Sequence, residues 1–103
     1  MKDLLKRIAH HYGYEAQSRQ IVEEMGELTV AINKHWRGCL ACGKLRLEDS
    51  NLHSREMDAM LEEIADVEIM IEQMKILLNC EEEVELYKEI KVKRQLERMK
   101  KYE

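Results

Sequence analysis

A six-residue pattern occurs twice in this sequence, and the fold follows from its repetition. Residues 23–28 read EEMGEL, and residues 62–67 read EEIADV. In both copies two glutamates are followed by a large apolar residue, a small residue, an acid and another large apolar residue. The flanking segments are rich in Glu, Leu, Ile and Met, and the chain has no proline, which favours helices. The repeat therefore predicts two amphipathic helices with the same layout.

Helical periodicity gives each of these helices an apolar stripe with an acidic flank beside it, at about 100° per residue. The first stripe consists of Ile21, Met25, Leu28 and Ile32, and its flank of Gln20, Glu24, Glu27 and Ala31. The second stripe consists of Met60, Ile64, Val67 and Ile71, and its flank of Ala59, Glu63, Asp66 and Met70. We expect the two stripes to pack together, so that the acidic flanks face each other.

The four acids of the two flanks should repel one another if they meet. Two carboxylates ~5 Å apart repel by roughly 3 kcal/mol at an effective dielectric constant near 20. Protonation could relieve part of this repulsion, but a divalent cation would neutralise the acids and bind their oxygens together. Oxygen ligands with few thiols or imidazoles favour a hard ion, Mg²⁺ or Mn²⁺, over zinc. The predicted metal ligands are Glu24, Glu27, Glu63 and Asp66.

A solvated acidic face is the alternative to a metal site. The chain has 21 acidic residues among 103, so two acids separated by two residues arise easily from composition alone. Glu82 and Glu85 show this spacing again without an evident partner. The matched stripe, flank and small residue in both helices favour the metal site over a solvated face.

Composition bounds the remaining possibilities. A chain of 103 residues with 45% apolar content is one domain, residues 1–103, with a core small enough that a helical protein often completes it by pairing with a copy of itself. The formal net charge of -4 offers no general attraction to nucleic acid or anionic lipid. The sequence has neither a membrane-spanning apolar run nor a signal-peptide core, and three cysteines fit a reducing compartment, so we expect a cytoplasmic protein.

The distribution of glycine predicts where the helices end. The expected fold is all-α, an antiparallel bundle of about four helices completed by homo-oligomerisation. Its helices should span residues 2–12, 14–37, 54–79 and 81 to the C-terminus. Gly13 and Gly38 should end the first two helices, since glycine adopts the left-handed cap conformation readily. The mixed composition of residues 38–53 predicts a loop insertion.

Gly26 lies inside a predicted helix, where glycine costs about 1 kcal/mol relative to alanine. The corresponding residue of the second copy is Ala65. Close approach of the two helix backbones would explain both small residues, and a tolerated imperfection is the alternative.

At this point the sequence resembles a known family. HYGYEAQSRQIVEEMGELTVAINK followed by EEIADVEIMIEQMKILL, about residues 10–80, is similar to the MazG-like all-α nucleoside triphosphate pyrophosphohydrolases. The family signature is an E-x-x-E pair on one helix, matched by Glu24 and Glu27, and an E-x-x-D pair on the next, matched by Glu63 and Asp66. The resemblance implies a Mg²⁺-dependent enzyme that cleaves a nucleoside triphosphate into a monophosphate and pyrophosphate, assembled as a homodimer or homotetramer.

The resemblance also suggests further site residues. The four metal ligands would be catalytic, and Glu23 or Glu62 could orient the attacking water. Both are expected to face solvent, because each lies about 100° around the helix from its metal-binding neighbour, and Glu23 is the better candidate for an exception. Candidates for base recognition are His11, Tyr14, Gln17, Gln20 and Trp36, with Gln20 favoured because it lies on the carboxylate flank. Lys93 and Arg94, in a basic C-terminal stretch, could contact the triphosphate, or could be the ordinary basic end of a helix.

Other functions stay open. Cys39 and Cys42, with His35, His53 and Cys80 elsewhere, invite a zinc interpretation, but one C-x-x-C pair is a weak signal, and reduced thiols are the alternative. A non-catalytic helical adaptor or regulator would share the fold without turnover. Within the enzyme class, a narrow dCTP or dUTP pyrophosphatase is possible, and a phosphoribosyl-ATP pyrophosphatase is a more distant alternative.

Overall fold

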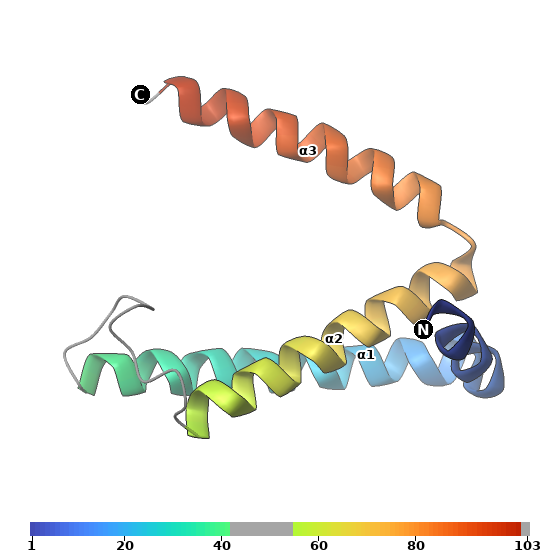
Figure 1. Cartoon of the computed structure of the whole chain (residues 1–103), viewed down its shortest axis with the longest axis horizontal. Coiled ribbons are helices and arrows are strands. Elements are labelled where there is room, and N and C mark those ends of the chain that lie inside the picture. The colour runs from blue at the N-terminus through green and yellow to red at the C-terminus, as the bar shows by residue number, and fades with distance from the viewer. Residues whose placement is uncertain (42–54, 102–103) are drawn as a thin grey trace.

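Three helices make up the part of the chain that the computed structural model describes, residues 1–41 and 55–101, with side chains described for residues 1–38 and 55–101. They are α1 (Lys2–Ala41), α2 (Arg55–Leu78) and α3 (Glu81–Lys101) (Figure 1). These residues contain no strand, which confirms the all-α class. No helix among them is long and apolar enough to cross a membrane.

Gly13 divides α1 into two helical segments. Its backbone angles, φ 86 and ψ 168, lie in a region that essentially only glycine adopts, so the predicted break at residue 13 is confirmed. The predicted end at Gly38 is wrong, because α1 continues to Ala41. A single glycine costs a helix only about 1 kcal/mol. The structure thus shows three helices, one of them bent, rather than the expected count of four.

The boundary between α2 and α3 follows from a specific cap. Asn79 has a positive φ of 51, and its N–H donates to the Ile76 carbonyl while that of Cys80 donates to the Lys75 carbonyl. This pattern is a Schellman motif, which stops a helix and satisfies its last carbonyls. The predicted helices at 54–79 and from 81 onward agree with the observed α2 and α3. Most of the predicted insertion at 38–53, namely residues 42–53, lies outside the described residues.

The packing of α1 against α2 forms the body of the molecule. The two helices run antiparallel and contact each other along their lengths, whereas α3, among the described helices, packs only against the end of α2 and meets α1 through an ion pair. The contact line buries Gln17 and Ala31 of α1 and Val67, Met70 and Gln73 of α2. Within it the Gln17 Nε2 group donates a hydrogen bond of 2.6 Å to Gln73 Oε1.

The apolar stripes do not meet as predicted. In this chain Met25 is 50% exposed and Ile32 46%, and on α2 Ile64 is 36% and Ile71 42% exposed. The helices are rotated so that the neighbouring flank, with Ala31 and Met70, lies at the contact line. The stripes are therefore covered only in part, since Val67 of the second stripe is buried whereas these four residues are exposed.

The predicted close approach at Gly26 is also wrong. A Cβ atom built on Gly26 would meet nothing within 4 Å. The missing side chain therefore leaves open space rather than permitting a contact between backbones.

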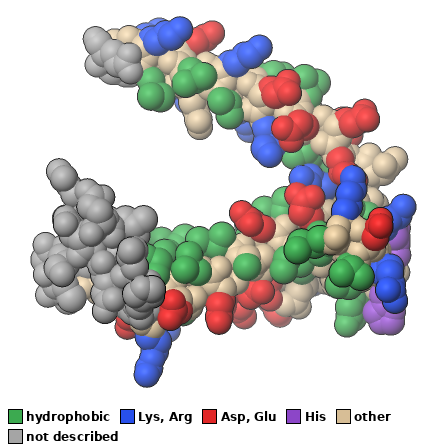
Figure 2. Space-filling view, viewed as in Figure 1, with side chains coloured by type: hydrophobic (Ala, Val, Ile, Leu, Met, Phe, Trp, Pro, Cys, Tyr) green, Lys and Arg blue, Asp and Glu red, His purple; other side chains and the backbone are tan. Residues whose placement is uncertain are grey.

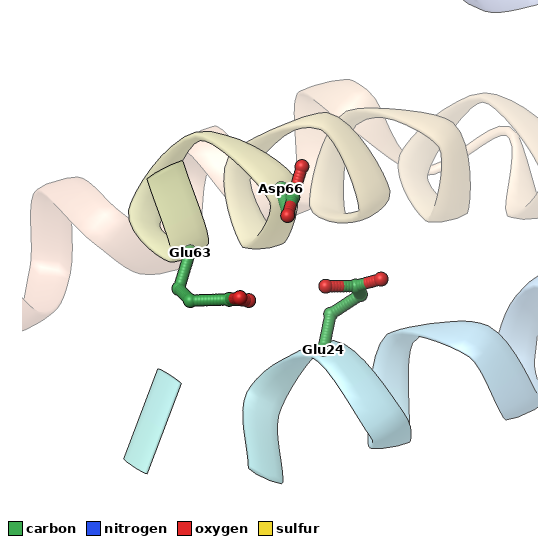
Figure 3. A group of neighbouring side chains, drawn as sticks. All are labelled: Glu24, Glu63 and Asp66. Atoms are coloured by element: carbon green, nitrogen blue, oxygen red, sulfur yellow. The ribbon is translucent and has the colours of Figure 1, made fainter. Parts of the chain in front are cut away.

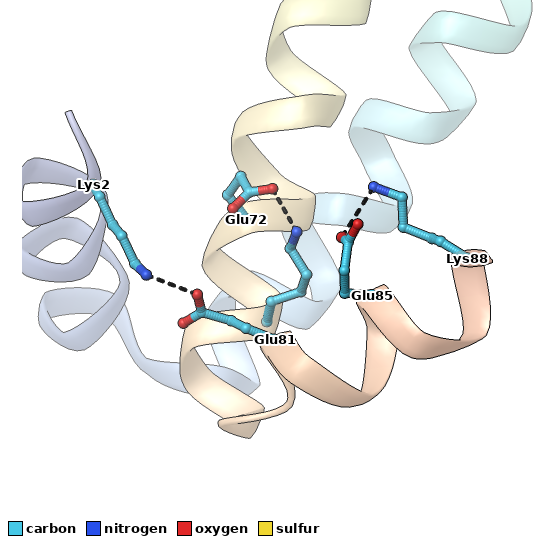
Figure 4. Close-up of polar contacts among 6 residues, drawn as sticks. Lys2, Glu72, Glu81, Glu85 and Lys88 are labelled. Atoms are coloured by element: carbon cyan, nitrogen blue, oxygen red, sulfur yellow. Dashed lines mark ion pairs between the residues drawn. The ribbon is translucent and has the colours of Figure 1, made fainter.

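Few interactions hold α3 to the body. Figure 4 shows an ion pair of 2.9 Å between Lys2 at the start of α1 and Glu81 at the start of α3. The hydrogen bond and charge of each partner raise the pKa of Lys2 and lower that of Glu81. Such exposed pairs contribute little to stability because water and salt screen them. No residue of α3 is buried.

Two glycine substitutions should change stability in opposite directions. Gly26→Ala should stabilise the protein by up to about 1 kcal/mol, because its helical position has room for a methyl group. Gly13→Ala should destabilise it by about 1–3 kcal/mol, because its backbone conformation is strained for any other residue. Urea unfolding followed by circular dichroism, at one protein concentration, measures both. Equal effects of the two substitutions would contradict the backbone assignment.

Candidate metal centre

Three carboxylates from two helices converge between α1 and α2. Glu24 projects from α1, and Glu63 and Asp66 project from adjacent turns of α2 (Figure 3). One oxygen from each lies within 4.8 Å of the others. The antiparallel pairing of the helices therefore brings together three of the four predicted ligands.

Glu27, the fourth predicted ligand, is not part of this group of three but lies near Glu63. The pKa of the Glu63 carboxyl is raised above its ordinary value, first by burial and then by the negative charges of Glu27, Asp66 and Glu24. The other three predicted ligands thus lie close enough to act on Glu63. Their mutual repulsion favours binding of either a proton or a cation.

Two buried oxygens of the centre have no hydrogen-bond partner, Glu24 Oε2 and Glu63 Oε2. The other Glu24 oxygen, Oε1, accepts a hydrogen bond of 2.8 Å from Gln20 Nε2. A buried polar atom without a partner costs about 1–3 kcal/mol, which a bound cation would relieve. The donor set consists of carboxylate oxygens, the ligands that Mg²⁺ and Mn²⁺ prefer. The residues present therefore fit a hard divalent ion.

An open pocket of about 650 Å³ lies beside the carboxylates, between α1 and the start of α2. This volume is within the range of roughly 300–1,000 Å³ typical of small-molecule sites. Its lining residues are Glu23, Gly26, Glu27, Val30, Ala31, Lys34, Arg55, Glu56, Ala59 and Glu63. The pocket therefore combines an acidic side with an apolar wall and two cationic side chains.

The polar residues predicted to bind substrate occupy several places. Gln20 contacts the metal centre through Glu24, whereas Gln17 is buried and bonded to Gln73, away from the pocket lining. Glu23 is exposed and lines the pocket, and Glu62 is exposed without lining it. Gln20 and Glu23 are thus placed to act near the carboxylates.

The aromatic and basic candidates lie elsewhere. Tyr14 and Trp36 are exposed outside the pocket lining, and the His11 ring packs edge-on against Tyr12 at 4.7 Å. Lys93 and Arg94 are on α3, which among the described residues does not pack against α1 and meets it in the ion pair at its first residue, Glu81. Within one chain the structure does not bring these residues to the carboxylates.

Three residues were not predicted from the sequence. They are Lys34 and Arg55, the two cationic side chains of the pocket, and Gln73, the partner of Gln17. Lys34 follows Glu27 by seven residues and Gln73 follows Asp66 by seven, two helical turns along the same side. That spacing was available as a signal. Arg55 gave no comparable signal, since it opens α2.

Cys39, Cys42 and His53, which raised zinc as a weaker alternative, lie outside the described side chains, and Cys80 is a free, half-buried thiol. Comparison of the chain with protein-family models, curated proteins and solved structures found no match. The geometry and charge of the carboxylates themselves therefore carry the chemical interpretation of this site.

Lowering the pH should stabilise the metal-free protein through Glu63. Because the pKa of this carboxyl is higher in the folded chain than its ordinary value, the folded state binds a proton first, and the free energy of unfolding rises as the pH falls toward 4.5. Thermal unfolding with a chelator, between pH 7 and pH 5, should show wild type gaining stability relative to Glu63→Gln. Identical pH profiles would contradict the burial and repulsion assigned to Glu63.

Proposed function

We propose that this chain is a Mg²⁺-dependent nucleoside triphosphate pyrophosphohydrolase that cleaves (d)NTP between the α and β phosphates. The observation that carries the proposal is the group formed by Glu24, Glu63 and Asp66, in which two buried oxygens lack partners. The spacing of Glu24 and Glu27 on α1, and of Glu63 and Asp66 on α2, matches the E-x-x-E and E-x-x-D signature of the MazG-like family, which the sequence resembles.

The metal would be held by Glu24, Glu63 and Asp66, with Glu27 close enough to join them. When bound, Mg²⁺, or Mn²⁺ in its place, supplies positive charge for phosphate oxygens and lowers the pKa of a bound water. Gln20 holds the Glu24 carboxylate by its amide N–H. This hydrogen bond would fix the position of the Glu24 carboxylate before an ion binds.

The hydrolysis needs a base for the attacking water. A bond forms between the water oxygen and the α phosphorus while the bond from that phosphorus to the bridging oxygen breaks, releasing pyrophosphate. Glu23 is the candidate to accept the water proton, because it is an exposed carboxylate lining the same pocket as Glu27 and Glu63. Glu62 does not line that pocket.

The pocket suits a molecule with an apolar part and an anionic part. Val30, Ala31 and Ala59 offer an apolar wall for the base or sugar, while Lys34 and Arg55 supply charge for phosphate oxygens. His11, Tyr14, Gln17, Trp36, Lys93 and Arg94 remain predicted substrate contacts. In this proposal the enzyme is cytoplasmic. It assembles as a homodimer or homotetramer, and its helices form a bundle of about four helices per chain.

Removing one carboxylate charge should abolish activity. Asp66→Asn or Glu27→Gln should lower Mg²⁺-dependent pyrophosphate release by more than about 100-fold, because even partners that only support metal ligands contribute 10–100-fold. A panel of ribo- and deoxyribonucleoside triphosphates, read out by pyrophosphate release, measures the effect. Helical content should remain near that of wild type.

The matched control is Glu68→Gln, which neutralises an exposed acid on α2 two residues beyond Asp66. This variant should retain wild-type turnover. Unchanged turnover in Asp66→Asn would reject the ligand assignment. Absence of pyrophosphate release by wild type with every nucleotide, and with either Mg²⁺ or Mn²⁺, would instead support a non-catalytic adaptor or regulator.

The cations of the pocket should affect substrate binding. Arg55→Gln should raise KM about tenfold with a smaller change in kcat, since one charge-assisted hydrogen bond contributes about 1.5 kcal/mol. Arg37→Gln is the control, because Arg37 is exposed on α1 and does not line the pocket. Equal KM values for the two variants would remove Arg55 from the phosphate site.

A further inference from the structure

Neither backbone conformation nor packing explains why residue 26 is glycine. Gly26 has helical backbone angles, since within the described part of α1 only Gly13 departs from them. A Cβ atom built on Gly26 would meet nothing within 4 Å, so no packed neighbour excludes a side chain. Glycine nevertheless costs a helix about 1 kcal/mol relative to alanine. A local cost without a structural return is typical of functional sites.

The repeated pattern supplies a comparison for Gly26. Ala65 occupies the corresponding place in the second copy, on α2. Both residues are exposed on helices, and each directly precedes an acid, Glu27 or Asp66. They differ in that Gly26 lines the pocket of about 650 Å³, whereas Ala65 does not. The glycine thus stands in the copy that borders the pocket.

The open space beside Gly26 belongs to this pocket. Glu23 and Val30, which lie about one helical turn before and after Gly26, line the pocket too, as does Glu27. A side chain at position 26 would therefore project into the pocket and not against other protein atoms. The missing Cβ atom enlarges the pocket at this point.

The pocket changes in character along its length, from acidic to apolar to charged. In that order its lining consists of Glu23, Glu27 and Glu63, then Val30, Ala31 and Ala59, then Lys34, Arg55 and Glu56. Gly26 lies where the acidic end meets the apolar middle, because it is one turn from Glu23 on one side and from Val30 on the other.

Glu63 indicates that the acidic end receives a ligand. This residue lines the pocket, and its Oε2 atom is buried without a hydrogen-bond partner. A nucleotide whose phosphates lie at the carboxylates must extend its sugar and base along the apolar middle, so it passes over Gly26. Because glycine has no side chain, a ligand can approach the helix backbone closely there.

We propose that Gly26 determines which bases this pocket accepts. The sugar and base of the nucleotide lie against α1 at Gly26, and the space left there admits two-ring purine bases as well as one-ring pyrimidines. A volume of about 650 Å³ is well within the range that buries drug-sized molecules. The identity of the ligand rests on the proposed function, whereas the role of Gly26 rests on the pocket.

Gly26→Val should change substrate preference and leave the fold intact. The valine side chain would fill part of the pocket, and overpacking of this size discriminates by about tenfold or more. The ratio of kcat/KM for dATP to that for dCTP should therefore fall at least about tenfold, as measured by Mg²⁺-dependent pyrophosphate release. Circular dichroism should show wild-type helical content, because valine is a better helix former than glycine.

The matched control is Ala65→Val, which enlarges the corresponding residue of the second copy outside the pocket lining. Its ratio of kcat/KM values should equal that of wild type. Equal ratios in wild type, Gly26→Val and Ala65→Val would overturn the role of Gly26 and leave the hydrolase assignment in place.

A binding measurement tests Gly26 without turnover. Anilinonaphthalene sulfonate is an aromatic anion, which suits a pocket with an apolar wall and two cations. Hydrophobic side chains are exposed on α3 and on the surface of the helix pair that faces it (Figure 2), so the total dye fluorescence would not report on the pocket alone. The readout is therefore the amide NMR signal of Val30, a lining residue present in every variant.

Titration of the Val30 signal with this dye should give a Kd about tenfold higher for Gly26→Val than for Ala65→Val. Equal Kd values, or no shift of this signal in wild type, would overturn the proposal even where pyrophosphate is released. A tenfold difference without pyrophosphate release by any variant would instead reject the hydrolase and keep Gly26 as the residue that limits the ligand.

Discussion

The structure depends on the line along which α1 touches α2, because polar groups occupy much of that line. Gln17 and Gln73 form a buried amide pair, and farther along α1 Glu24 faces Glu63 and Asp66. Sliding one helix past the other would break the amide pair and leave buried polar atoms without partners, at about 1–3 kcal/mol each. The Gln17–Gln73 bond therefore favours the register in which the carboxylates meet.

The same contact line explains why the chain exposes large apolar side chains. Two packed helices cover only a limited width of each other's surface, and here amides, acids and Ala31 occupy part of it beside Val67 and Met70. Stripe residues such as Met25 and Ile71 lie outside this width and remain exposed. A local departure from apolar packing is typical of functional sites, where stability is recovered elsewhere. The buried acids and the exposed apolar surface thus have one cause.

Local sequence features predicted the helices, but not which face of each helix packs against its neighbour. The break at Gly13 and the change from α2 to α3 after Asn79 depend on a few neighbouring residues, so the sequence reveals them. Periodicity shows which residues share a face, but not which face meets a neighbour, because stripe and flank are only about 100° apart or less. The acidic cluster could be predicted because either orientation brings the flanks near each other. The pocket around Arg55 could not, since it requires the packed helices.

In the proposed enzyme an ion and a second copy of the chain would both bind the α1–α2 pair. The ion would relieve repulsion around Glu63, which Glu24 and Asp66 approach, and the copy would cover exposed apolar side chains such as Met25 and Ile71. Both would bind the paired helices and not the unfolded chain, so under the proposed function each would raise the population of the state that the other binds. The metal-free single chain has both repelling acids and exposed apolar surface, which makes it the least stable species. Occupancy of the metal centre and assembly would then be linked properties.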